Sequence, residues 1–152
     1  MIRYFYQLSF SYEVEKDREG NPVFSSFDLG YLSTKAKVMA KIEEYKNLPG
    51  FKDHPIDCFI IDKFGVSFDK DIKDKSSVVL YELWHEYEDE DGYERPSSWV
   101  GFKTKKEATE YMNRLKKRGI YKKYPNDFNI ARIKIDADVM GWEEGFKSFD
   151  AD

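Results

Sequence analysis

His85 and the carboxylates that follow it are the residues of this chain whose types and spacing could do chemistry. Glu86, Glu88, Asp89 and Asp91 come directly after His85, and imidazole and carboxylate groups can bind metal ions or exchange protons. Neighbouring residues of a strand point to opposite faces, however, so His85 and Glu86 would not converge on one ligand. We therefore interpret His85 as a hydrogen-bonded structural residue, and an enzyme centred on it is the least favoured class of function.

Other catalytic and metal-binding patterns are missing from the sequence. It contains no serine–histidine–aspartate set, no phosphate-binding glycine loop and no cysteine–histidine metal spacing. His54, the second histidine, precedes Pro55 and is interpreted as an aromatic-like packing residue of a turn. Cys58, the single cysteine, lies in an apolar run and is expected to be an inert thiol in a reducing compartment. The sequence predicts no catalytic residue, no metal and no cofactor.

The segment after His85 is strongly acidic and is predicted to be a hairpin. Such runs commonly only solvate a turn, but clustered carboxylates also steer basic partners toward a surface. Two tryptophans, Trp84 and Trp99, flank the hairpin, and exposed tryptophan is a frequent anchor of protein interfaces; burial of Trp84 under a C-terminal tail is the alternative. The candidate protein-binding residues are Trp84, Glu88, Asp89, Glu90, Asp91 and Trp99.

A basic stretch follows the acidic one. Its lysine and arginine residues outnumber its acidic residues, Glu107 and Glu110. Tyr121 and Tyr124 lie among the last of these basic residues, and basic residues combined with aromatic ones can bind phosphates and stack on bases. The alternative is an exposed helix with charge pairs and lysines at its C-terminal end, which we favour because the chain as a whole has a net charge of -4. The candidate nucleic-acid-binding residues are Lys116, Lys117, Arg118, Lys122 and Lys123.

The elements that must position these residues occur twice. The run Tyr6–Glu13 returns as Tyr81–Glu88, and matching positions continue at a slowly falling offset, 75 residues for Tyr6 and Tyr81 and 69 for Phe59 and Phe128. Such a drift is typical of a duplicated domain after small loop deletions. His85 corresponds to Phe10 in the first copy, so the chain carries no duplicated catalytic set.

Each copy is predicted to be strand, strand, helix, strand. In the first copy, apolar residues at alternate positions from Ile2 to Val14 predict a long strand with one buried face. The other predicted elements of this copy are a hairpin over 15–22, a strand over 23–32, a helix from Ser33 or Thr34 to about Asn47, and a strand over 58–68. In the second copy they are strands from Val79 to Tyr87 and from Trp99 to Lys103, a helix with a capping-box start at Thr104, and a strand from Phe128 to Ile135.

The predicted fold class is therefore α+β, with mostly antiparallel strands, two helices on one side and a pseudo-twofold duplication. We expect repeat one over 1–68, a linker over 69–77, and repeat two over 78–152 with a C-terminal tail that repeat one lacks. Because about 70 residues bury little surface alone, we expect the repeats to share one core. Trp142 and Phe146 of the tail are expected to pack back onto the body.

Composition limits the classes of function. The chain has 152 residues, of which 41% are hydrophobic, 17% aromatic and 36% charged, as in a globular protein. The N-terminus does not resemble a signal peptide, and no apolar run approaches the roughly 20 residues that span a bilayer. We expect a cytoplasmic protein that does not bind membranes.

Several motifs resemble a small bacterial domain of unknown function. In repeat two they are Tyr81-x-Leu83-x-His85-x-Tyr87-Glu88, Val100-Gly101-Phe102, Tyr124-Pro125-x-x-Phe128-x-Ile130 and Trp142-x-Glu144-Gly145-Phe146. Repeat one keeps Leu48-Pro49-Gly50-Phe51 and Phe59-x-Ile61, but has Phe10 where the pattern has histidine and lacks the closing motif. The resemblance implies an accessory bacterial protein, in some members an immunity component of a toxin locus.

These observations favour a non-enzymatic bacterial protein-binding module of the accessory or immunity type, which engages another, possibly basic, protein through the acidic hairpin and the aromatic sheet face. The alternative is a nucleic-acid-associated accessory protein that uses the basic helix and turn of repeat two. An exposed edge strand could also support a homodimer.

Overall fold

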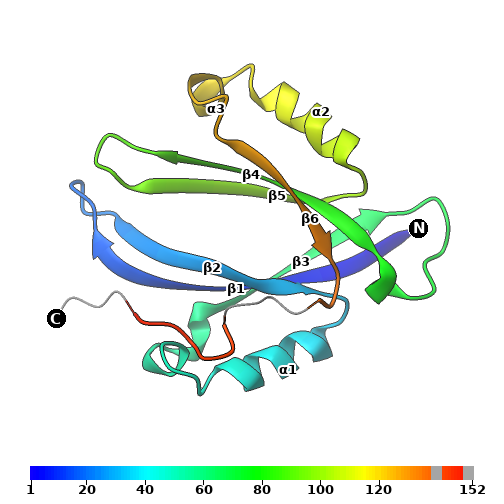
Figure 1. Ribbon diagram of the computed structural model, residues 1–152, viewed down its shortest axis with the longest axis horizontal. Coiled ribbons are helices and arrows are strands. Elements are labelled where there is room, and N and C mark those ends of the chain that lie inside the picture. The colour runs from blue at the N-terminus through cyan, green and yellow to red at the C-terminus, as the bar shows by residue number, and fades with distance from the viewer. Residues whose placement is uncertain (138–141, 149–152) are drawn as a thin grey trace. The chain divides into compact units, whose positions relative to one another are not determined.

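The computed structural model describes residues 1–137 and 142–148 (Figure 1). The strands are β1 (Ile2–Lys16), β2 (Pro22–Leu32), β3 (Phe59–Ser67), β4 (Val79–Glu88), β5 (Glu94–Phe102) and β6 (Phe128–Lys134). The helices are α1 (Lys35–Tyr45), α2 (Lys105–Leu115) and α3 (Gly119–Lys123), and short 3₁₀ turns lie at Phe51–Asp53, Ile56–Cys58 and Lys75–Ser77. The predicted order of strand, strand, helix, strand is present in each repeat.

The strands form two antiparallel three-stranded sheets, β2-β1-β3 and β5-β4-β6, so the fold is α+β with two similar halves. The predicted class is confirmed. Three details differ: β5 begins at Glu94 instead of Trp99, β6 ends at Lys134, and a short third helix, α3, follows α2.

The chain divides into two compact units that do not coincide with the predicted boundaries. Unit one comprises Arg3–Gly65 together with Ile135–Asp152, and unit two comprises Met1–Ile2 with Val66–Lys134. The tail was predicted as part of repeat two, yet its described residues belong with repeat one. Repeat two is thus inserted between two stretches of chain that build unit one.

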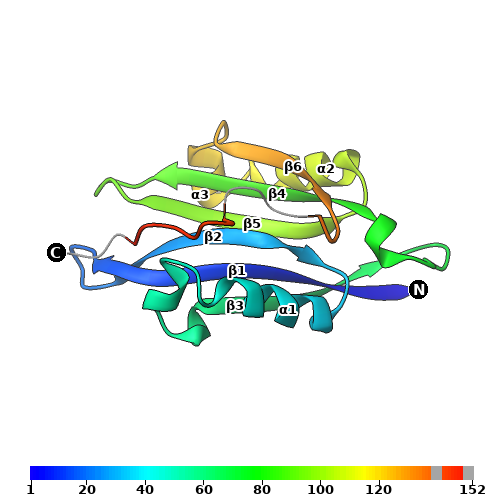
Figure 2. The ribbon, with the colours of Figure 1, turned by 60° about the horizontal axis from the view of Figure 1, so that its bottom comes forward.

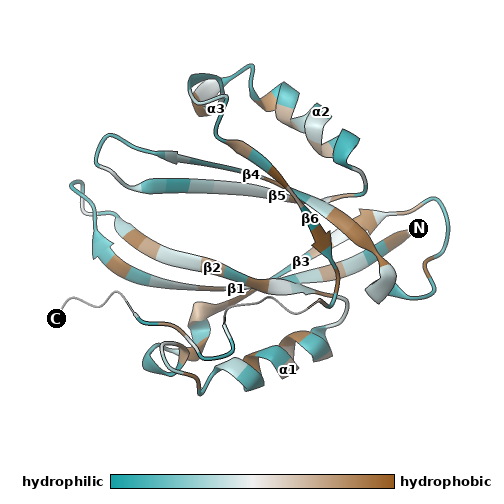
Figure 3. Cartoon of the chain, viewed as in Figure 1, coloured by the Kyte–Doolittle hydropathy of each residue, from teal (hydrophilic) through white to brown (hydrophobic). Residues whose placement is uncertain are grey.

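Unit one is held by a core between α1 and the β2-β1-β3 sheet (Figure 2). Val38, Ile42 and Tyr45 are buried on one face of α1, where their spacing matches the helical repeat. Hydrophobic bands accordingly alternate with hydrophilic ones along α1 (Figure 3). They pack against buried residues of the sheet and the following turn: Leu8, Phe10, Tyr12, Leu29, Leu32, Phe51 and Phe59.

The predicted alternation of β1 is wrong at its first residues. Ile2 and Tyr4 are 57% and 48% exposed, whereas Phe5 and Leu8 are fully buried. Phe5 packs on Phe64, with ring centroids 5.9 Å apart. The start of β1 therefore buries the opposite face from the one that Leu8, Phe10 and Tyr12 bury, which a single alternating pattern cannot describe.

Both main helices begin as their sequences predict. The Thr34 hydroxyl accepts a hydrogen bond from the Lys37 N–H at 3.2 Å, and the Thr104 hydroxyl accepts one from the Glu107 N–H at 3.1 Å. The Glu107 carboxylate in turn accepts the backbone N–H of Lys103 at 2.9 Å. These bonds satisfy N–H groups that have no partner within the helix.

The two hairpins use one turn chemistry. The Asp17 carboxylate accepts the backbone N–H groups of Glu19 and Asn21 at 3.0 and 2.8 Å. In the second copy, the Asp89 carboxylate accepts those of Asp91 and Tyr93 at 2.9 and 3.0 Å. An aspartate that hydrogen-bonds the backbone ahead of it closes a tight turn in each case.

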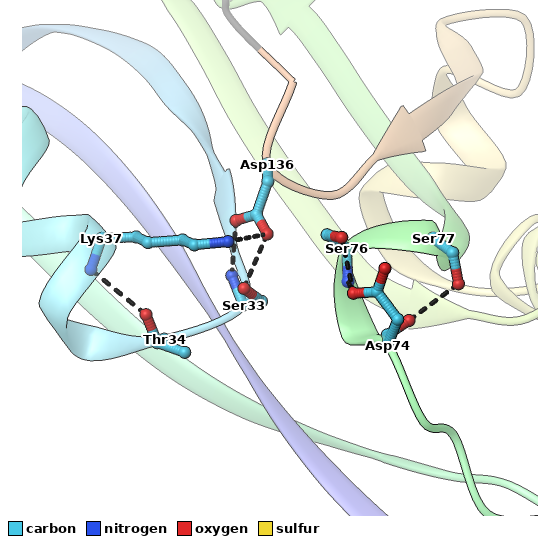
Figure 4. A network of polar contacts seen from close by, with 7 residues as sticks. All are labelled: Ser33, Thr34, Lys37, Asp74, Ser76, Ser77 and Asp136. Carbon is cyan, nitrogen blue, oxygen red and sulfur yellow. Dashed lines mark hydrogen bonds and ion pairs between the residues drawn. The ribbon is translucent and has the colours of Figure 1, made fainter.

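Asp136 attaches the chain after β6 to the start of α1 (Figure 4). Its carboxylate accepts the backbone N–H and hydroxyl of Ser33 at 2.9 and 2.6 Å, and pairs with the Lys37 ammonium at 2.8 Å. Its own N–H donates to the Tyr31 carbonyl at 2.8 Å. Since the first turn of α1 has no acidic residue, Asp136 supplies the negative charge that a helix N-terminus favours.

The surroundings of Asp136 shift the pKa of its carboxyl group. Partial burial acts to raise the pKa of its carboxyl group, but the hydrogen bonds from Lys37 and Ser33 outweigh this effect, and the pKa lies below its ordinary value. A comparable local device closes the 3₁₀ turn at Lys75–Ser77, where the Asp74 carboxylate accepts the Ser76 N–H and hydroxyl (Figure 4).

Candidate protein-binding site

The side of the β5-β4-β6 sheet that carries α2 and α3 has a group of rings in contact, which we call the repeat-two aromatic cluster. Its members are His85, Tyr87, Tyr121, Tyr124 and Phe128. His85 lies at its centre, with ring centroids 5.0 Å from Tyr121 and 4.5 Å from Phe128, and Tyr87 stacks on Tyr124 at 4.8 Å. His85 is fully buried, whereas the other four members are half-exposed.

His85 is held as a packing residue. Its Nε2 atom lies 2.8 Å from the Tyr124 carbonyl oxygen, and because a carbonyl only accepts, Nε2 must carry the proton. Nδ1 is buried and has no hydrogen-bond partner among the described residues. Glu86 and Glu88, its neighbours in sequence, point to the other face of β4, so these three side chains do not assemble a metal or acid–base site.

Repeat one contains the same arrangement of rings. Phe10, which replaces His85, lies 5.0 Å from Phe51 and 4.9 Å from Phe59, and Tyr12 stacks on His54 at 4.2 Å. The ring pairs Phe10–Phe51 and His85–Tyr121 also have similar interplanar angles, 77° and 80°. The duplication therefore reaches from the sequence to the geometry of side chains.

In repeat one, this ring arrangement is covered by the tail. Phe146 lies 4.8 Å from Phe51, 5.6 Å from Phe10 and 5.7 Å from Tyr12, and Trp142 stacks on Phe27 at 4.2 Å with an interplanar angle of 18°. The expected packing of Trp142 and Phe146 onto the body is confirmed, with repeat one as the surface that receives them.

Three acidic residues of repeat two, Glu86, Glu88 and Glu94, lie on the other face of its sheet. Glu88 lies directly opposite Glu94 across the β4–β5 pair, and Glu86 precedes Glu88 on the same face of β4. Partial desolvation, followed by the charges of Glu86, Glu88 and Asp127, raises the pKa of Glu94. Like charges directly opposite each other on neighbouring strands repel. Glu86, Glu88 and Glu94, which we call the acid cluster, therefore form a concentrated negative surface.

Asp89, by contrast, has a structural role in the turn. The Arg95 Nε atom lies 2.6 Å from its carboxylate, in addition to the two backbone N–H groups that close the hairpin. The hydrogen bond from the Tyr93 N–H, supported by Arg95 and the Asp91 N–H, lowers the pKa of Asp89 although partial desolvation opposes the shift. Glu90 and Asp91 are exposed at the tip of the hairpin.

The two candidate tryptophans lie on opposite faces of the sheet. Trp99 pairs with Leu83 in the β4–β5 ladder, whereas Trp84 pairs with Ser98, and adjacent residues of a strand alternate in direction. Trp99 packs on the helical side, 5.4 Å from Tyr121 and 6.0 Å from Tyr111. Trp84 is half-exposed on the face that carries the acid cluster. The structure therefore does not bring the two predicted anchors together.

Part of the basic stretch is used internally. The Lys116 ammonium lies over the Phe128 ring, 6.0 Å from its centroid, and the Lys123 ammonium lies 5.5 Å from the centroid of Tyr124, as cation–π contacts. Lys117, Arg118 and Lys122 are exposed. Lys123 is exposed as well, so four of the five predicted cations are turned mainly to solvent and Lys116 is partly buried.

Two further features concern the predicted chemistry. Within residues 1–137 and 142–148, no cluster of three or more histidine, cysteine or acidic side chains could hold a metal ion, and no helix there is long and apolar enough to cross a membrane. Cys58 packs half-buried against the core of unit one, and burial, followed by the charge of Asp57, raises the pKa of its thiol.

Sequence reasoning did not identify the repeat-two aromatic cluster as a surface. The sequence did contain an indication of this cluster, because each of its rings has an aromatic counterpart at the matching position of repeat one. The comparisons with known proteins add no assignment: no protein-family model matches the sequence, and no curated protein or solved structure matches it significantly.

Proposed function

We propose that this chain is a non-enzymatic protein-binding module that takes a basic partner protein on the acid-cluster face of repeat two. The observation that carries the proposal is the direct opposition of Glu88 and Glu94 across the β4–β5 pair, with Glu86 beside them. Such a placement costs stability in the free protein. A cationic partner would relieve the repulsion, and long-range attraction would speed association.

Trp84 supplies an apolar anchor for the same partner. It is half-exposed and lies on the face of β4 that also carries Glu86 and Glu88. A large aromatic side chain with acidic residues around it combines desolvation at the centre with charge complementarity at the rim, as in many interfaces. Trp99 packs against α2 and α3 instead, so we assign it a structural role.

The chemistry of this face is consistent with an accessory or immunity-type protein of bacteria, as the resemblance of the motifs implies. A protein that cleaves nucleic acid presents a basic cleft to phosphates, and an acidic surface can occupy such a cleft. In this proposal the acid cluster would take the place of phosphate groups.

The test is a pull-down with the tagged full-length chain from a lysate of its own host, with and without nuclease. We expect a stoichiometric, nuclease-insensitive protein whose affinity falls as salt rises. Replacing Glu86, Glu88 and Glu94 by glutamine should weaken capture about tenfold or more and flatten the salt dependence, since each rim charge contributes to steering. Asp89 is left intact because it closes the turn.

The duplication provides a matched control. Glu13, Glu15 and Glu19 belong to the corresponding hairpin of repeat one, and their replacement by glutamine removes the same charge. This variant should bind as the parent does. Equal effects of both triple variants would point to net charge alone, and unchanged capture by the repeat-two variant would reject the proposed surface.

The alternative function is association with nucleic acid through Lys116, Lys117, Arg118, Lys122 and Lys123. We favour it less because Lys116 and Lys123 already lie over aromatic rings of repeat two. It predicts that nuclease abolishes capture and that Lys117, Arg118 and Lys122 carry the salt dependence. That outcome of the pull-down would replace the protein-binding proposal.

A further inference from the structure

We propose that the acid-cluster face of repeat two binds an extended segment of the partner protein in which arginine residues occupy alternate positions. This inference rests on the proposed function, because it names the part of the basic partner that contacts the face. Two observations support it besides the charge of the acid cluster. Trp84 lies in the same row of side chains as two of the glutamates, and the corresponding face of repeat one is built differently.

The row of side chains lies along one face of β4. Trp84, Glu86 and Glu88 occupy alternate positions of the strand, so neighbours in the row are about 7 Å apart. Trp84 and Glu86 are half-exposed, and Glu88 is exposed. A second extended chain presents its own alternate side chains at the same interval and can place one against each member of the row. A helix fits less well, because its residues four apart rise about 6 Å and turn by about 40° at each step.

The hairpin end of the row suits a guanidinium group. Glu88 lies opposite Glu94 in the β4–β5 ladder, and the Cβ atoms of such a pair are about 5 Å apart. An arginine between the two carboxylates can donate to both with its planar set of N–H groups, an arrangement that a lysine ammonium does not match. Two charge-assisted hydrogen bonds then replace the repulsion between the glutamates.

The other end of the row takes an arginine through the Trp84 ring. The face of an indole ring attracts a guanidinium group that lies over it. Trp84 pairs with Ser98 on β5 and with Asn129 on β6, so the ring is flanked by smaller side chains, which are both exposed. Between the two ends, Glu86 lies opposite Pro96, which has no N–H group to donate to the carboxylate. The middle arginine of the segment pairs with Glu86.

The corresponding face of repeat one bonds within the protein. Ser11, which corresponds to Glu86, lies opposite Ser26, and the two hydroxyl oxygens are 2.7 Å apart. Glu13, the counterpart of the next glutamate, lies opposite Phe24 and therefore faces no second carboxylate. The two repeats share one arrangement of strands, so the fold does not require carboxylates opposite each other at this place. A cationic segment bound from outside accounts for them in repeat two.

The probes are two synthetic peptides of one composition, Thr-Arg-Thr-Arg-Thr-Arg-Thr and Thr-Thr-Arg-Arg-Arg-Thr-Thr, each blocked at both ends. An extended chain places all arginines of the first peptide on one side, but turns the middle arginine of the second away. Each peptide is added to the full-length protein and followed by NMR. We expect saturable binding of the alternating peptide, with shifts at the Trp84 indole N–H and at Glu86, Glu88 and Glu94. The clustered peptide should bind about tenfold more weakly, because it loses one charge-assisted contact.

Variants of the protein and of the peptide assign the contacts. Glu94→Gln and Trp84→Ala should each weaken binding of the alternating peptide about fivefold or more. A version with lysine in place of every arginine should bind several-fold more weakly, since an ammonium group does not lie as a planar fork between two carboxylates. Glu13→Gln is the matched control: it removes one negative charge from repeat one and should change the affinity by less than about twofold.

Equal affinities of the two arginine peptides would overturn the inference, because the face would then respond to net charge alone. Unchanged affinity in both Glu94→Gln and Trp84→Ala, or shifts centred away from the row, would overturn it as well. The pull-down judges the proposed function separately. Loss of the partner in the triple glutamine variant of the acid cluster upholds the binding face even when the two peptides bind equally, whereas normal capture by that variant rejects the face itself.

Discussion

At the scale of single residues, the duplication places two different side chains in equivalent surroundings. Phe10 is packed by rings on several sides, and His85 occupies the same place with a hydrogen bond to the Tyr124 carbonyl and an Nδ1 atom that has no partner in the described part of the chain. A buried polar atom without a partner costs roughly 1–3 kcal/mol. His85 therefore gives repeat two less stability than its full burial suggests.

This comparison predicts that His85→Phe is tolerated. The variant loses the bond to Tyr124, but it also removes the unpaired Nδ1 atom and inserts a ring that repeat one accommodates. We expect the free energy of unfolding to change by less than about 1 kcal/mol, whereas His85→Ala should cost about 3 kcal/mol through the cavity it leaves. Urea denaturation measures both variants, and a phenylalanine variant as unstable as the alanine variant would contradict the structural role.

Asp136 is the second residue with a predictable contribution. Asp136→Asn should lower the free energy of unfolding by about 1–2 kcal/mol near neutral pH, since it weakens charge-assisted bonds to Ser33 and Lys37. Because the pKa of Asp136 is lowered in the folded protein, its carboxylate stabilises the fold above the pKa of the unfolded chain. That contribution is lost as the pH falls through the lower, folded pKa.

The measurement is urea denaturation of the parent and of Asp136→Asn across the acidic range. The difference between them should be constant near neutral pH and shrink toward zero as the carboxyl group becomes protonated. A difference that persists unchanged in strong acid would show that the charge of Asp136 is not its source.

At the scale of elements, the tail acts as a packing element although its described residues form no helix or strand. Phe146 contributes its ring to the core of unit one, and its N–H is hydrogen-bonded to Pro49. The tail thereby buries rings that the corresponding elements of repeat two leave half-exposed.

Truncation of this ring should be costly. Phe146→Ala is expected to lower the free energy of unfolding by about 2–4 kcal/mol, because it removes ring contacts from a packed core. Glu144→Gln, an exposed change two residues earlier, is the control and should have little effect. Thermal denaturation distinguishes them, and similar melting temperatures for both variants would mean that the tail is not part of the core.

At the scale of the whole molecule, unit one is built from two stretches of chain separated by repeat two. Ile135 is buried, Asp136 is bonded to Ser33 and Tyr31, and Phe146 enters the core. All three residues follow β6 in the sequence. Folding of unit one thus requires contacts between residues about a hundred positions apart, which are slow to form.

This connectivity predicts the behaviour of a fragment. Residues 1–68 alone should fold poorly, because they lack the aromatic and carboxylate groups that the C-terminal segment supplies and because small domains have little stability to lose. Addition of a peptide that spans 135–148 should increase the ordered fraction. Circular dichroism and NMR dispersion are the measurements, and a fragment as stable as the full chain would show that the C-terminal segment is dispensable.

The sequence by itself determined the local structure and the repeat. Hydrophobic periodicity, the hydroxyl caps at Thr34 and Thr104 and the hairpin aspartates act within a few residues of themselves, so their consequences can be read from neighbouring positions. The comparison of the copies also identified His85 as a packing residue, since Phe10 replaces it. The shared core, the partner and the cytoplasmic location remain predictions of the sequence.

Only the tertiary structure decided which surfaces are covered and which are accessible. The tail follows repeat two in the chain but covers repeat one, and Trp84 and Trp99 lie on opposite faces because of the ladder register of β4 and β5. Both outcomes depend on which distant segments meet, and local patterns carry little information about such contacts. Burial of the rings in one repeat and their exposure in the other therefore follow from packing, although the sequences of the two repeats are alike.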